Sequence, residues 1–426
     1  MRANFTAEQI ADPQLGPAAQ AVRSCVHCGI CTATCPTYVM LGDERDSPRG
    51  RIVMMQKMLE DGGAPSRETV HHIDRCLSCL NCKTACPSSV DYRRLVDQAR
   101  AHIQDHYRRP LGDRLLRWMI AQVMTRPRFL RIALLLAKLG APVAKHLPGR
   151  LGAMVAIGAR AKLSGPEPYV FPKPDVIKQR IAIMPGCAQA ALAPQIDAAV
   201  ARVLARRGIE LVPLEGAGCC GALPHHMGRD ADARAFAKRA ITAWEQGRYD
   251  GVLITATGCS SQLKDYVHQF AGDPVWEARA QKFAASARDF AELCTPLTSQ
   301  PPHALRVAYH PACSLQNSLK LNGVSEALLR AAGFTLTPFL EAHLCCGSAG
   351  TYSILQPELA GDLRQRKLDH IQAAQPDVIV SGNIGCLQHL AAGAGLAQPI
   401  LHIAELLDYA ESHVWPAHLA LPRNCA

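Results

Sequence analysis

The stretches GCCG (Gly218–Gly221) and LCCG (Leu344–Gly347) place two adjacent cysteines before a glycine twice in one chain, 126 positions apart. Two other cysteines recur within one residue of that offset: Cys187 as Cys313, and Cys259 as Cys386. Around them, short apolar runs alternate with amphipathic stretches, which is typical of parallel α/β units. The C-terminal part is therefore predicted to hold two copies of one α/β domain, called here the first and second CCG repeats.

The expected strands place the repeated cysteines at one edge of each sheet. Buried strands are predicted in RIAIMPGC, IELVPL and GVLITATGC of the first repeat, and in LRVAYHPAC, FTLTPF and DVIVSGNIGC of the second. Each repeated cysteine then lies in a loop at the carboxyl end of a strand, where open α/β sheets bind ligands. Four thiols per repeat are expected to share a metal site: Cys187, Cys219, Cys220 and Cys259 in the first, and Cys313, Cys345, Cys346 and Cys386 in the second.

The residues leave the occupant of these two sites open. Four thiolates suit an iron–sulfur cluster or zinc equally well. Adjacent cysteine side chains diverge along an extended backbone, so they reach two iron atoms of a cluster more easily than one small ion. The alternative is a pair of buried thiols that pack as small apolar groups.

The N-terminal cysteines follow a stricter pattern. CVHCGICTATCP (Cys25–Pro36) and CLSCLNCKTACP (Cys76–Pro87) are both C-x2-C-x2-C-x3-C-P, the two-cluster ferredoxin pattern, in which the fourth cysteine serves the other cluster. Zinc sites have less use for a third evenly spaced cysteine. Two [4Fe–4S] clusters are predicted: one on Cys25, Cys28, Cys31 and Cys86, the second on Cys76, Cys79, Cys82 and Cys35.

The segment between the two motifs predicts a helix after Ser47, which can cap it, with Gly62 at its end. Arg49 and Arg51 on this helix are expected on a solvated face. Cys294 and Cys425 are isolated and are expected to play no part. Histidines near the second cysteine set are expected to pack or to donate hydrogen bonds rather than to bind metal: His225, His226, His310, His343 and His389.

Charge is concentrated in one segment. The chain carries a net +10, and residues 108–162 hold 12 Lys and Arg against the single acid Asp113. This segment is too interrupted by charge to span a bilayer. Its helices are expected either to lie on an anionic membrane surface or to pack with a basic face in solvent. The predicted domains are a helical ferredoxin domain (1–107), basic helices with a Pro-rich linker (108–180), and the two CCG repeats (181–300 and 301–426).

The absence of nucleotide-binding and flavin-binding motifs limits the functions that this chain can have. With 18 cysteines and no apparent signal peptide, the chain is expected in a reducing compartment, where regularly spaced cysteines indicate metal. It has no P-loop, no convincing dinucleotide fingerprint and no flavin motif. A chain of clusters without a hydride acceptor moves single electrons, so substrate chemistry is expected in a partner subunit. A thiol-based redox sensor is the alternative of another class.

These motifs together resemble the CCG-domain electron-transfer subunits related to heterodisulfide reductase, and among them the iron–sulfur subunits of glycolate oxidase (glycolate dehydrogenase). The resemblance rests on CVHCGICTATCPTY, LGDERDSPRGRI, CLSCLNCKTACPS, AGCCGA, HLCCGSAGTY and NIGC, and covers nearly the whole chain. Some relatives use a fifth cysteine for a noncubane cluster. Gln262 and His389 stand at that position here, so an ordinary [4Fe–4S] cluster, zinc or an empty site stay open.

The resemblance implies a complex with FAD-containing subunits that oxidise glycolate to glyoxylate. This chain would pass their electrons toward quinone, attached peripherally to the cytoplasmic face of the inner membrane, with no nucleic-acid partner. Iron–sulfur subunits of anaerobic glycerol-3-phosphate dehydrogenase or of a lactate dehydrogenase are the alternatives within the same broad group.

Overall fold

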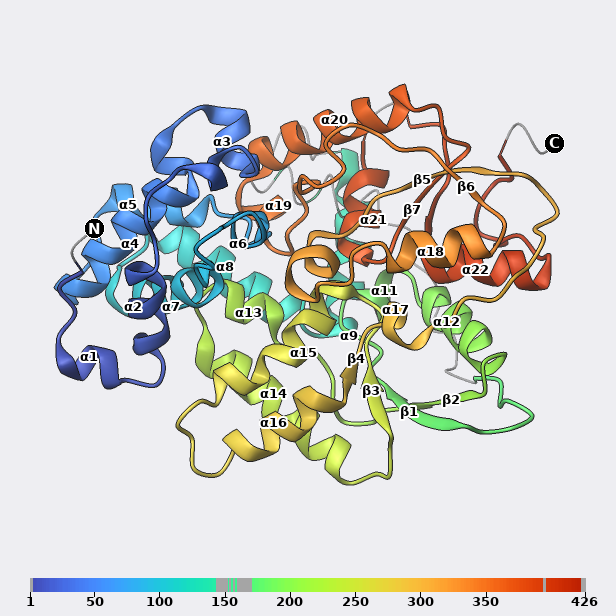
Figure 1. Cartoon of the computed structure of the whole chain (residues 1–426), viewed down its shortest axis with the longest axis horizontal. Helices are drawn as coiled ribbons and strands as arrows, with labels where there is room; N and C mark the ends of the chain where they lie inside the picture. Colours follow the sequence, from blue (N-terminus) through green and yellow to red (C-terminus); the bar gives the residue numbers. More distant parts are fainter. Residues whose placement is uncertain are drawn as a thin grey trace.

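A computed structural model describes residues 3–142, 152, 155, 158, 171–393 and 396–422. Figure 1 shows three regions: N-terminal helices at the left, the first repeat below and the second repeat above right. Helices α8 and α9 pass behind the place where these regions meet. Cys425 and much of the Pro-rich linker lie outside the described residues.

The N-terminal region is helical, as the sequence predicts. Ser47 caps helix α4 (Pro48–Asp61) by accepting a hydrogen bond from the Gly50 backbone N–H, and Gly62 ends it in a left-handed conformation. The other helices of this region are short apart from α7: α1 (Ala7–Ala11), α2 (Leu15–Arg23), η1 (Ile30–Thr32), α3 (Pro36–Leu41), η2 (Glu44–Asp46), α5 (Arg67–Asp74), α6 (Asn81–Thr84) and α7 (Tyr92–His106).

The basic segment forms helices α8 (Leu111–Val123) and α9 (Pro127–Leu139). Arg117 lies on the packed face of α8, where it pairs with Asp74 at 2.9 Å and Asp113 at 3.1 Å. Within the described residues, no helix combines the length and apolar character needed to cross a bilayer.

Each CCG repeat forms its own parallel sheet of four strands. The orders are β2-β1-β3-β4 and β6-β5-β7-β8, so the two sheets have the same topology. The strands are β1 (Gln179–Ile183), β2 (Ile209–Pro213), β3 (Gly251–Leu253), β4 (Ala287–Arg288), β5 (Arg306–Tyr309), β6 (Thr335–Leu336), β7 (Val378–Ser381) and β8 (Ile400–His402). The fourth strand of each sheet was not predicted from the sequence, and FTLTPF forms only the two-residue β6.

Helices cover both sheets. Those of the first repeat are α11 (Gln189–Leu192), α12 (Gln195–Ala205), α13 (Ala222–His226), α14 (Asp230–Glu245), α15 (Thr257–Gln269), α16 (Glu277–Ser286) and α17 (Phe290–Leu293). Those of the second are the π-helical turn η4 (Ser314–Ser318), α18 (Val324–Ala331), α19 (Tyr352–Leu355), α20 (Pro357–Ala373), α21 (Ile384–Ala391) and α22 (Ile403–Ser412). One apolar core contains side chains of both sheets, and α12 packs against α22 across the repeat boundary.

The glycine of each CCG sequence is required by the backbone and by packing. Gly221 has φ +77° and Gly347 has φ +92°, which L side chains rarely adopt. A Cβ on Gly347 would lie 2.7 Å from the Ala360 carbonyl oxygen of α20, and one on Gly221 would lie 3.0 Å from that of Ala233 on α14. The glycine therefore turns the chain sharply after the cysteine pair and lets a helix pack against the turn.

Candidate metal centres

The first N-terminal motif forms one group with the last cysteine of the second motif. Cys25, Cys28, Cys31 and Cys86 line a small cavity of about 30 Å³, to which Cys82 also contributes. Burial and the thiols of Cys25, Cys35 and Cys86 raise the pKa of Cys31 to about 11. These four cysteines are the set expected for the first cluster.

The other set gathers around Cys82. Burial raises the pKa of the Cys82 thiol well above its usual range, and the neighbouring thiols of Cys79, Cys76 and Cys35 add to the effect. Burial likewise raises the pKa of the Cys79 thiol well above its usual range, and binding iron would remove the protons of this set. The donor set therefore fits a thiolate-ligated cluster.

Arg51 is buried beside this second set, so the expectation of a solvated face was wrong for this residue. Its side chain is 1% exposed and pairs with the fully buried Asp46 at 3.0 Å. It also donates to the Thr37 hydroxyl at 3.0 Å and lies 3.9 Å from the Cys35 sulfur. A buried cation next to a cluster ligand stabilises negative charge there. Arg49 remains 37% exposed and pairs with Glu44.

In the first CCG repeat, the four repeated cysteines lie together. The Cys219 and Cys187 sulfurs are 3.6 Å apart. The Cys220 thiol contacts those of Cys219 and Cys259. The contact with Cys219 lowers the pKa of Cys220, but the contact with Cys259 and burial outweigh it and raise that pKa well above its usual range. Cys259 lies in the first turn of α15 rather than in a loop, which corrects the predicted placement.

The second repeat brings its four cysteines together in the same way. The Cys313 and Cys345 sulfurs are 4.0 Å apart. Cys346 contacts Cys345 and Cys386, and Cys386 lies in the first turn of α21, again on a helix rather than in a loop.

His310 distinguishes the second site from the first. Its ring nitrogen and the sulfurs of Cys346 and Cys386 all lie within 4.8 Å of one another. Hydrogen bonds from Cys346 and His310 lower the pKa of Cys386 to about 5 although the thiol is buried. This histidine was expected to pack or to form hydrogen bonds and was not among the predicted ligands. The signal that could have found it is its position directly after a strand, where the first repeat has Met184.

The second repeat also receives the N-terminal region. Burial raises the pKa of the Cys79 thiol, and the neighbouring thiol of Cys345 raises it further. Asn317 donates to the Cys79 carbonyl at 2.9 Å and accepts from the Thr84 hydroxyl at 2.8 Å. Asn81 donates to the His343 carbonyl at 3.0 Å. The second cysteine group and the second CCG site are therefore neighbours.

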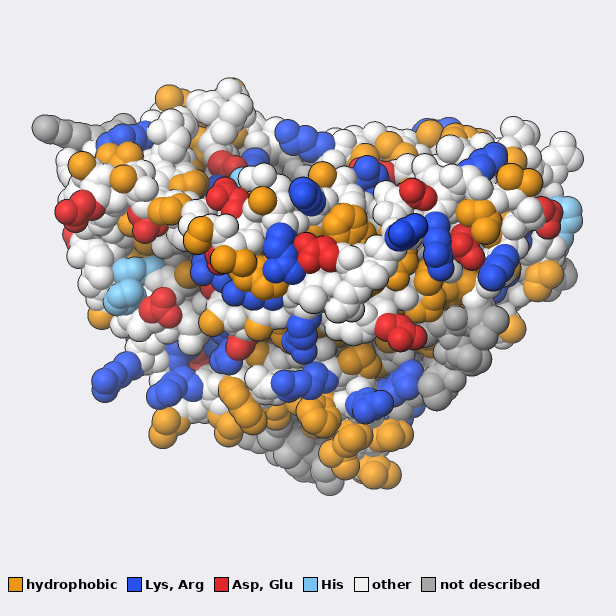
Figure 2. All heavy atoms as spheres, turned by 90° about the horizontal axis from the view of Figure 1, so that it is seen from below, with side chains coloured by type: hydrophobic (Ala, Val, Ile, Leu, Met, Phe, Trp, Pro, Cys, Tyr) orange, Lys and Arg blue, Asp and Glu red, His pale blue; other side chains and the backbone are white. Residues whose placement is uncertain are grey.

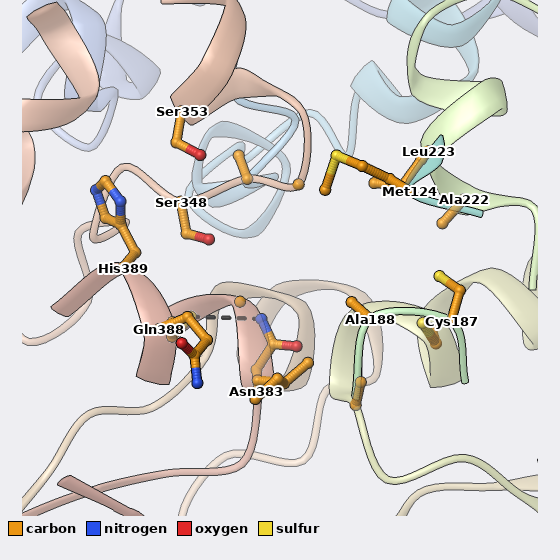
Figure 3. A pocket seen from close by; sticks show the side chains of 18 of the residues that line it. Met124, Cys187, Ala188, Ala222, Leu223, Ser348, Ser353, Asn383, Gln388 and His389 are labelled. Atoms are coloured by element: carbon orange, nitrogen blue, oxygen red, sulfur yellow. Dashed lines mark hydrogen bonds between the residues drawn. The ribbon is translucent and has the colours of Figure 1, made fainter. Parts of the chain in front are cut away.

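A single large cavity lies between the two CCG sites. Its volume is about 760 Å³, and cysteines of both repeats line it. Figure 3 shows Cys187 and Ala188 on one side, Ser348, Asn383 and His389 on the other, and Met124 and Leu223 at a third edge. The dashed line marks the hydrogen bond of 3.4 Å from the Asn383 amide to the Cys386 sulfur.

Comparison with known proteins agrees with this arrangement. The 4Fe-4S dicluster domain matches residues 21–90, and the cysteine-rich domain matches residues 181–264 and 307–391. The chain is thus a two-cluster iron–sulfur protein with a duplicated cysteine-rich domain.

Full-length relatives define the family. The chain is 39% identical to the glycolate oxidase iron-sulfur subunit of Escherichia coli, over 96% of this chain and 99% of the relative. It is 30% identical to the probable glycolate oxidase iron-sulfur subunit of Bacillus subtilis, over 92% and 94%. It belongs to the family of glycolate oxidase iron–sulfur subunits, as the sequence resemblance indicated.

More distant matches cover less of the chain or share only the fold. Lactate utilization protein A of Geobacillus kaustophilus is 30% identical over 50% of this chain and 92% of its own length. A hypothetical protein from Helicobacter pylori has a similar structure, with a TM-score of 0.53 and 8% identity over 95% of this chain and 73% of that one. The latter likeness concerns the fold alone.

Proposed function

We propose that this chain is the electron-transfer subunit of a membrane-attached complex that oxidises glycolate to glyoxylate. FAD-containing partner subunits remove two electrons from glycolate, and this chain carries them one at a time to a quinone. The observation that carries the proposal is the contact between Cys79 and Cys345, because it joins the N-terminal cysteine groups to the second CCG site. The membership of the family of glycolate oxidase iron–sulfur subunits supplies the substrate.

The ligand sets follow from the grouping of the cysteines. Two [4Fe–4S] clusters are held by the crossed N-terminal sets, and each CCG site holds a further cluster on its four thiols. Iron fits these sites because several sulfurs share one buried place, and adjacent cysteines in each CCG pair can reach different metal atoms. The clusters supply one-electron chemistry when bound. The chain itself positions the ligands, excludes water and places Arg51 beside one cluster.

The route begins in the N-terminal region, continues from the Cys79 group to the Cys345 group, and ends at the cavity between the repeats. Asn81 and Asn317 hold the N-terminal region against the second repeat with neutral hydrogen bonds. Flavin subunits then dock on the N-terminal side of the molecule, where Cys28 is exposed.

Helices α8 and α9 provide the membrane contact. Their outer faces expose large apolar side chains, among them Leu111 at 80%, Leu139 at 79% and Leu115 at 64%. Basic residues lie among them, including Arg114 and Arg128. The lower edge of Figure 2 shows hydrophobic and basic side chains side by side, on the side of the molecule that lies at the rear of Figure 1. This combination favours the surface of an anionic bilayer.

The decisive experiment uses the complex purified anaerobically from its host membrane. Glycolate, lactate and glycerol 3-phosphate are supplied in turn, with a short-tail ubiquinone as acceptor. We expect glycolate to reduce both the clusters and the quinone. Preferential oxidation of lactate would indicate that the complex is a lactate dehydrogenase instead. The match to lactate utilization protein A favours this second function. Zinc in place of iron in the isolated complex would disprove electron transfer altogether.

The membrane contact has its own test. Leu139→Glu introduces a charge on the exposed face of α9 and should reduce co-sedimentation of the complex with anionic vesicles. Leu340→Glu is the matched control, because Leu340 is similarly exposed, at 72% against 79% for Leu139, but lies in the second repeat. Equal vesicle binding by both variants contradicts a contact through α9.

A further inference from the structure

The cavity between the repeats is larger and more apolar than a single metal site needs to be. The cavity lined by the cysteines of the first N-terminal group measures about 30 Å³, whereas this one measures about 760 Å³. Sites for small organic molecules commonly occupy about 300–1,000 Å³ and have mostly apolar walls with a few polar groups. Metal centres on the thiols of the two CCG sites take up part of this volume, and the part along α8 and α9 leaves room for an organic molecule beside them.

The walls of this cavity come from three parts of the chain. Cysteines of the first CCG site, including Cys187 and Cys259, line one side, and Cys386 of the second site lines the opposite side. Side chains of α8, of Met124 directly after it, and of α9, including Ala133, form another wall. The cavity therefore extends from the redox sites to the inner side of the helices whose outer faces are apolar and exposed.

We propose that this cavity binds the lipid quinone and that quinone is reduced there, which rests on the proposed function. The isoprenoid tail follows α8 and α9 toward the bilayer, and the ring lies between the two CCG sites. A flat ring with an apolar tail matches apolar walls that continue onto a membrane-facing surface. A water-soluble acceptor, by contrast, needs no apolar route.

Polar groups stand where the ring oxygens are expected. The Ser348 hydroxyl and the Asn383 amide both point into the cavity from the second repeat (Figure 3). Each can donate a hydrogen bond to a carbonyl oxygen, whose negative charge grows on reduction. The Asn383 amide also donates to the Cys386 sulfur, so it connects the second site to the ring.

A buried carboxyl lies behind the cavity wall. Asp197 is fully buried and accepts hydrogen bonds from Gln189 at 2.5 Å and from the Thr255 hydroxyl at 2.8 Å. Gln189 and Thr255 both line the cavity. Burial raises the pKa of Asp197 to about 7, although these hydrogen bonds oppose the shift, so a protonated form exists at neutral pH. Asp197 is a positioning residue that supplies protons through Thr255.

The reaction balances as follows. The quinone accepts two electrons, delivered singly by the clusters, and two protons, and leaves as quinol. The electrons come from glycolate through the flavin subunits. The protons come ultimately from water, with Asp197 giving up its proton and taking another.

The test uses the intact complex and decylubiquinone. Met124→Trp and Ala133→Trp fill the cavity from α8 and α9, and Ala285→Trp makes the same change as Ala133→Trp at an exposed position of α16. We expect both cavity variants to raise the KM for decylubiquinone about tenfold or more, which corresponds to a loss of about 1.4 kcal/mol of binding. Reduction of ferricyanide by glycolate, which reports on the clusters, should stay unchanged in all three.

A second measurement does not depend on any variant. A photoreactive azidoquinone should label peptides from α8, α9 or residues 383–389 of the unaltered complex, and excess decylubiquinone should prevent the labelling. Asp197→Asn should lower kcat with decylubiquinone while leaving the labelling and the ferricyanide activity intact.

The outcomes separate the site from the function. Labelling elsewhere, or cavity variants with an unaltered KM for decylubiquinone, overturns this site while the proposed function stands. A complex that passes glycolate electrons to ferricyanide but to no quinone overturns the quinone step and this site together. A complex that glycolate does not reduce at all overturns the proposed function.

Discussion

The two CCG repeats share a sheet topology but are joined to the N-terminal region by different chemistry. The second repeat is joined mainly by the amides of Asn81 and Asn317, and Arg93 also donates to its Ser318 hydroxyl at 3.0 Å. The first is joined by buried ion pairs: Asp97 of α7 lies 3.3 Å from His225, and Asp265 pairs with Arg93 and Arg94. The amides of Asn81 and Asn317 thus tie the second repeat to the residues around Cys79, whereas ion pairs hold the first repeat to α7.

Register shows how the duplication diverged. His310 and Met184 occupy equivalent positions, because each donates its backbone N–H to the neighbouring strand, at 2.7 Å to Val380 and 2.8 Å to Leu253. Asn317 corresponds in the same 126-residue offset to Ala191, which packs against α9. The two copies therefore share the same cysteines, but the residues around those cysteines differ and make different contacts. The second repeat contacts the residues around Cys79, and the first packs on α9.

The strongest test of this division removes one cysteine from each repeat. Cys345→Ser should abolish electron flow from glycolate to decylubiquinone, because the cysteine group of Cys345 adjoins Cys79. Cys219→Ser is its counterpart and should leave the N-terminal clusters able to reduce the second CCG site. Rapid-freeze EPR after mixing with glycolate measures which clusters become reduced. Identical EPR time courses in the two variants would falsify the order of the sites.

Removing the histidine should change the second site selectively. His310→Met makes it resemble the first site and should shift the EPR signal and lower iron retention at that site by about 10–100-fold, as loss of a ligand-supporting contact commonly does. Met184→His is the reciprocal change. If His310→Met alters neither the spectrum nor the iron content, His310 only fills space.

The amide junction predicts a smaller effect. Asn317→Ala removes the donor to the Cys79 carbonyl and the acceptor for Thr84, at a cost of about 1–3 kcal/mol for the groups left unpaired. Electron transfer into the second repeat should slow while cluster content stays complete. Asn322→Ala makes the same change at an exposed position of the same repeat and serves as the control. Stopped-flow bleaching of the cluster absorbance gives both rates, and equal rates contradict the role of the junction.

The ion pair of the first repeat predicts a pH dependence. Burial opposes protonation of His225, but Asp97 and Asp230 raise its pKa to about 10, above the value of about 6.5 for an unfolded chain. The stabilisation is therefore fully present below pH 6.5 and is lost as pH rises toward 10. Denaturant unfolding of the complex between pH 6.5 and 10 should show this decline, and His225→Gln should flatten it. An unchanged slope in His225→Gln assigns the decline to other groups.

The sequence predicted the fold where local pattern decides it and failed where distant residues meet. Cap and glycine signals predicted α4, and the cysteine offset predicted two equivalent sheets. Strand β4 was missed because two residues carry too little periodicity to be recognised.

The sites show the same limit. Spacing predicted Cys86 with the first motif and Cys35 with the second. In the structure Cys86 lines the cavity of the first motif, and Cys35 adds to the pKa shift of Cys82. Arg51 was misplaced because its partner Asp46 and the sulfur of Cys35 approach it only in the folded chain. The same holds for the neighbourhood of Cys79 and Cys345, which are 266 positions apart in the sequence.

The apolar core common to both sheets has a consequence for how the molecule folds and how it arose. Because Leu253 of one sheet and Val380 of the other belong to the same core, neither repeat can open without exposing the other. The two copies are therefore expected to melt as one cooperative unit. A single-copy ancestor would have exposed this surface and covered it by pairing with itself, as self-complementary surfaces do in twofold dimers. Fusion of two copies then made that pairing independent of concentration and left each half free to change on its own.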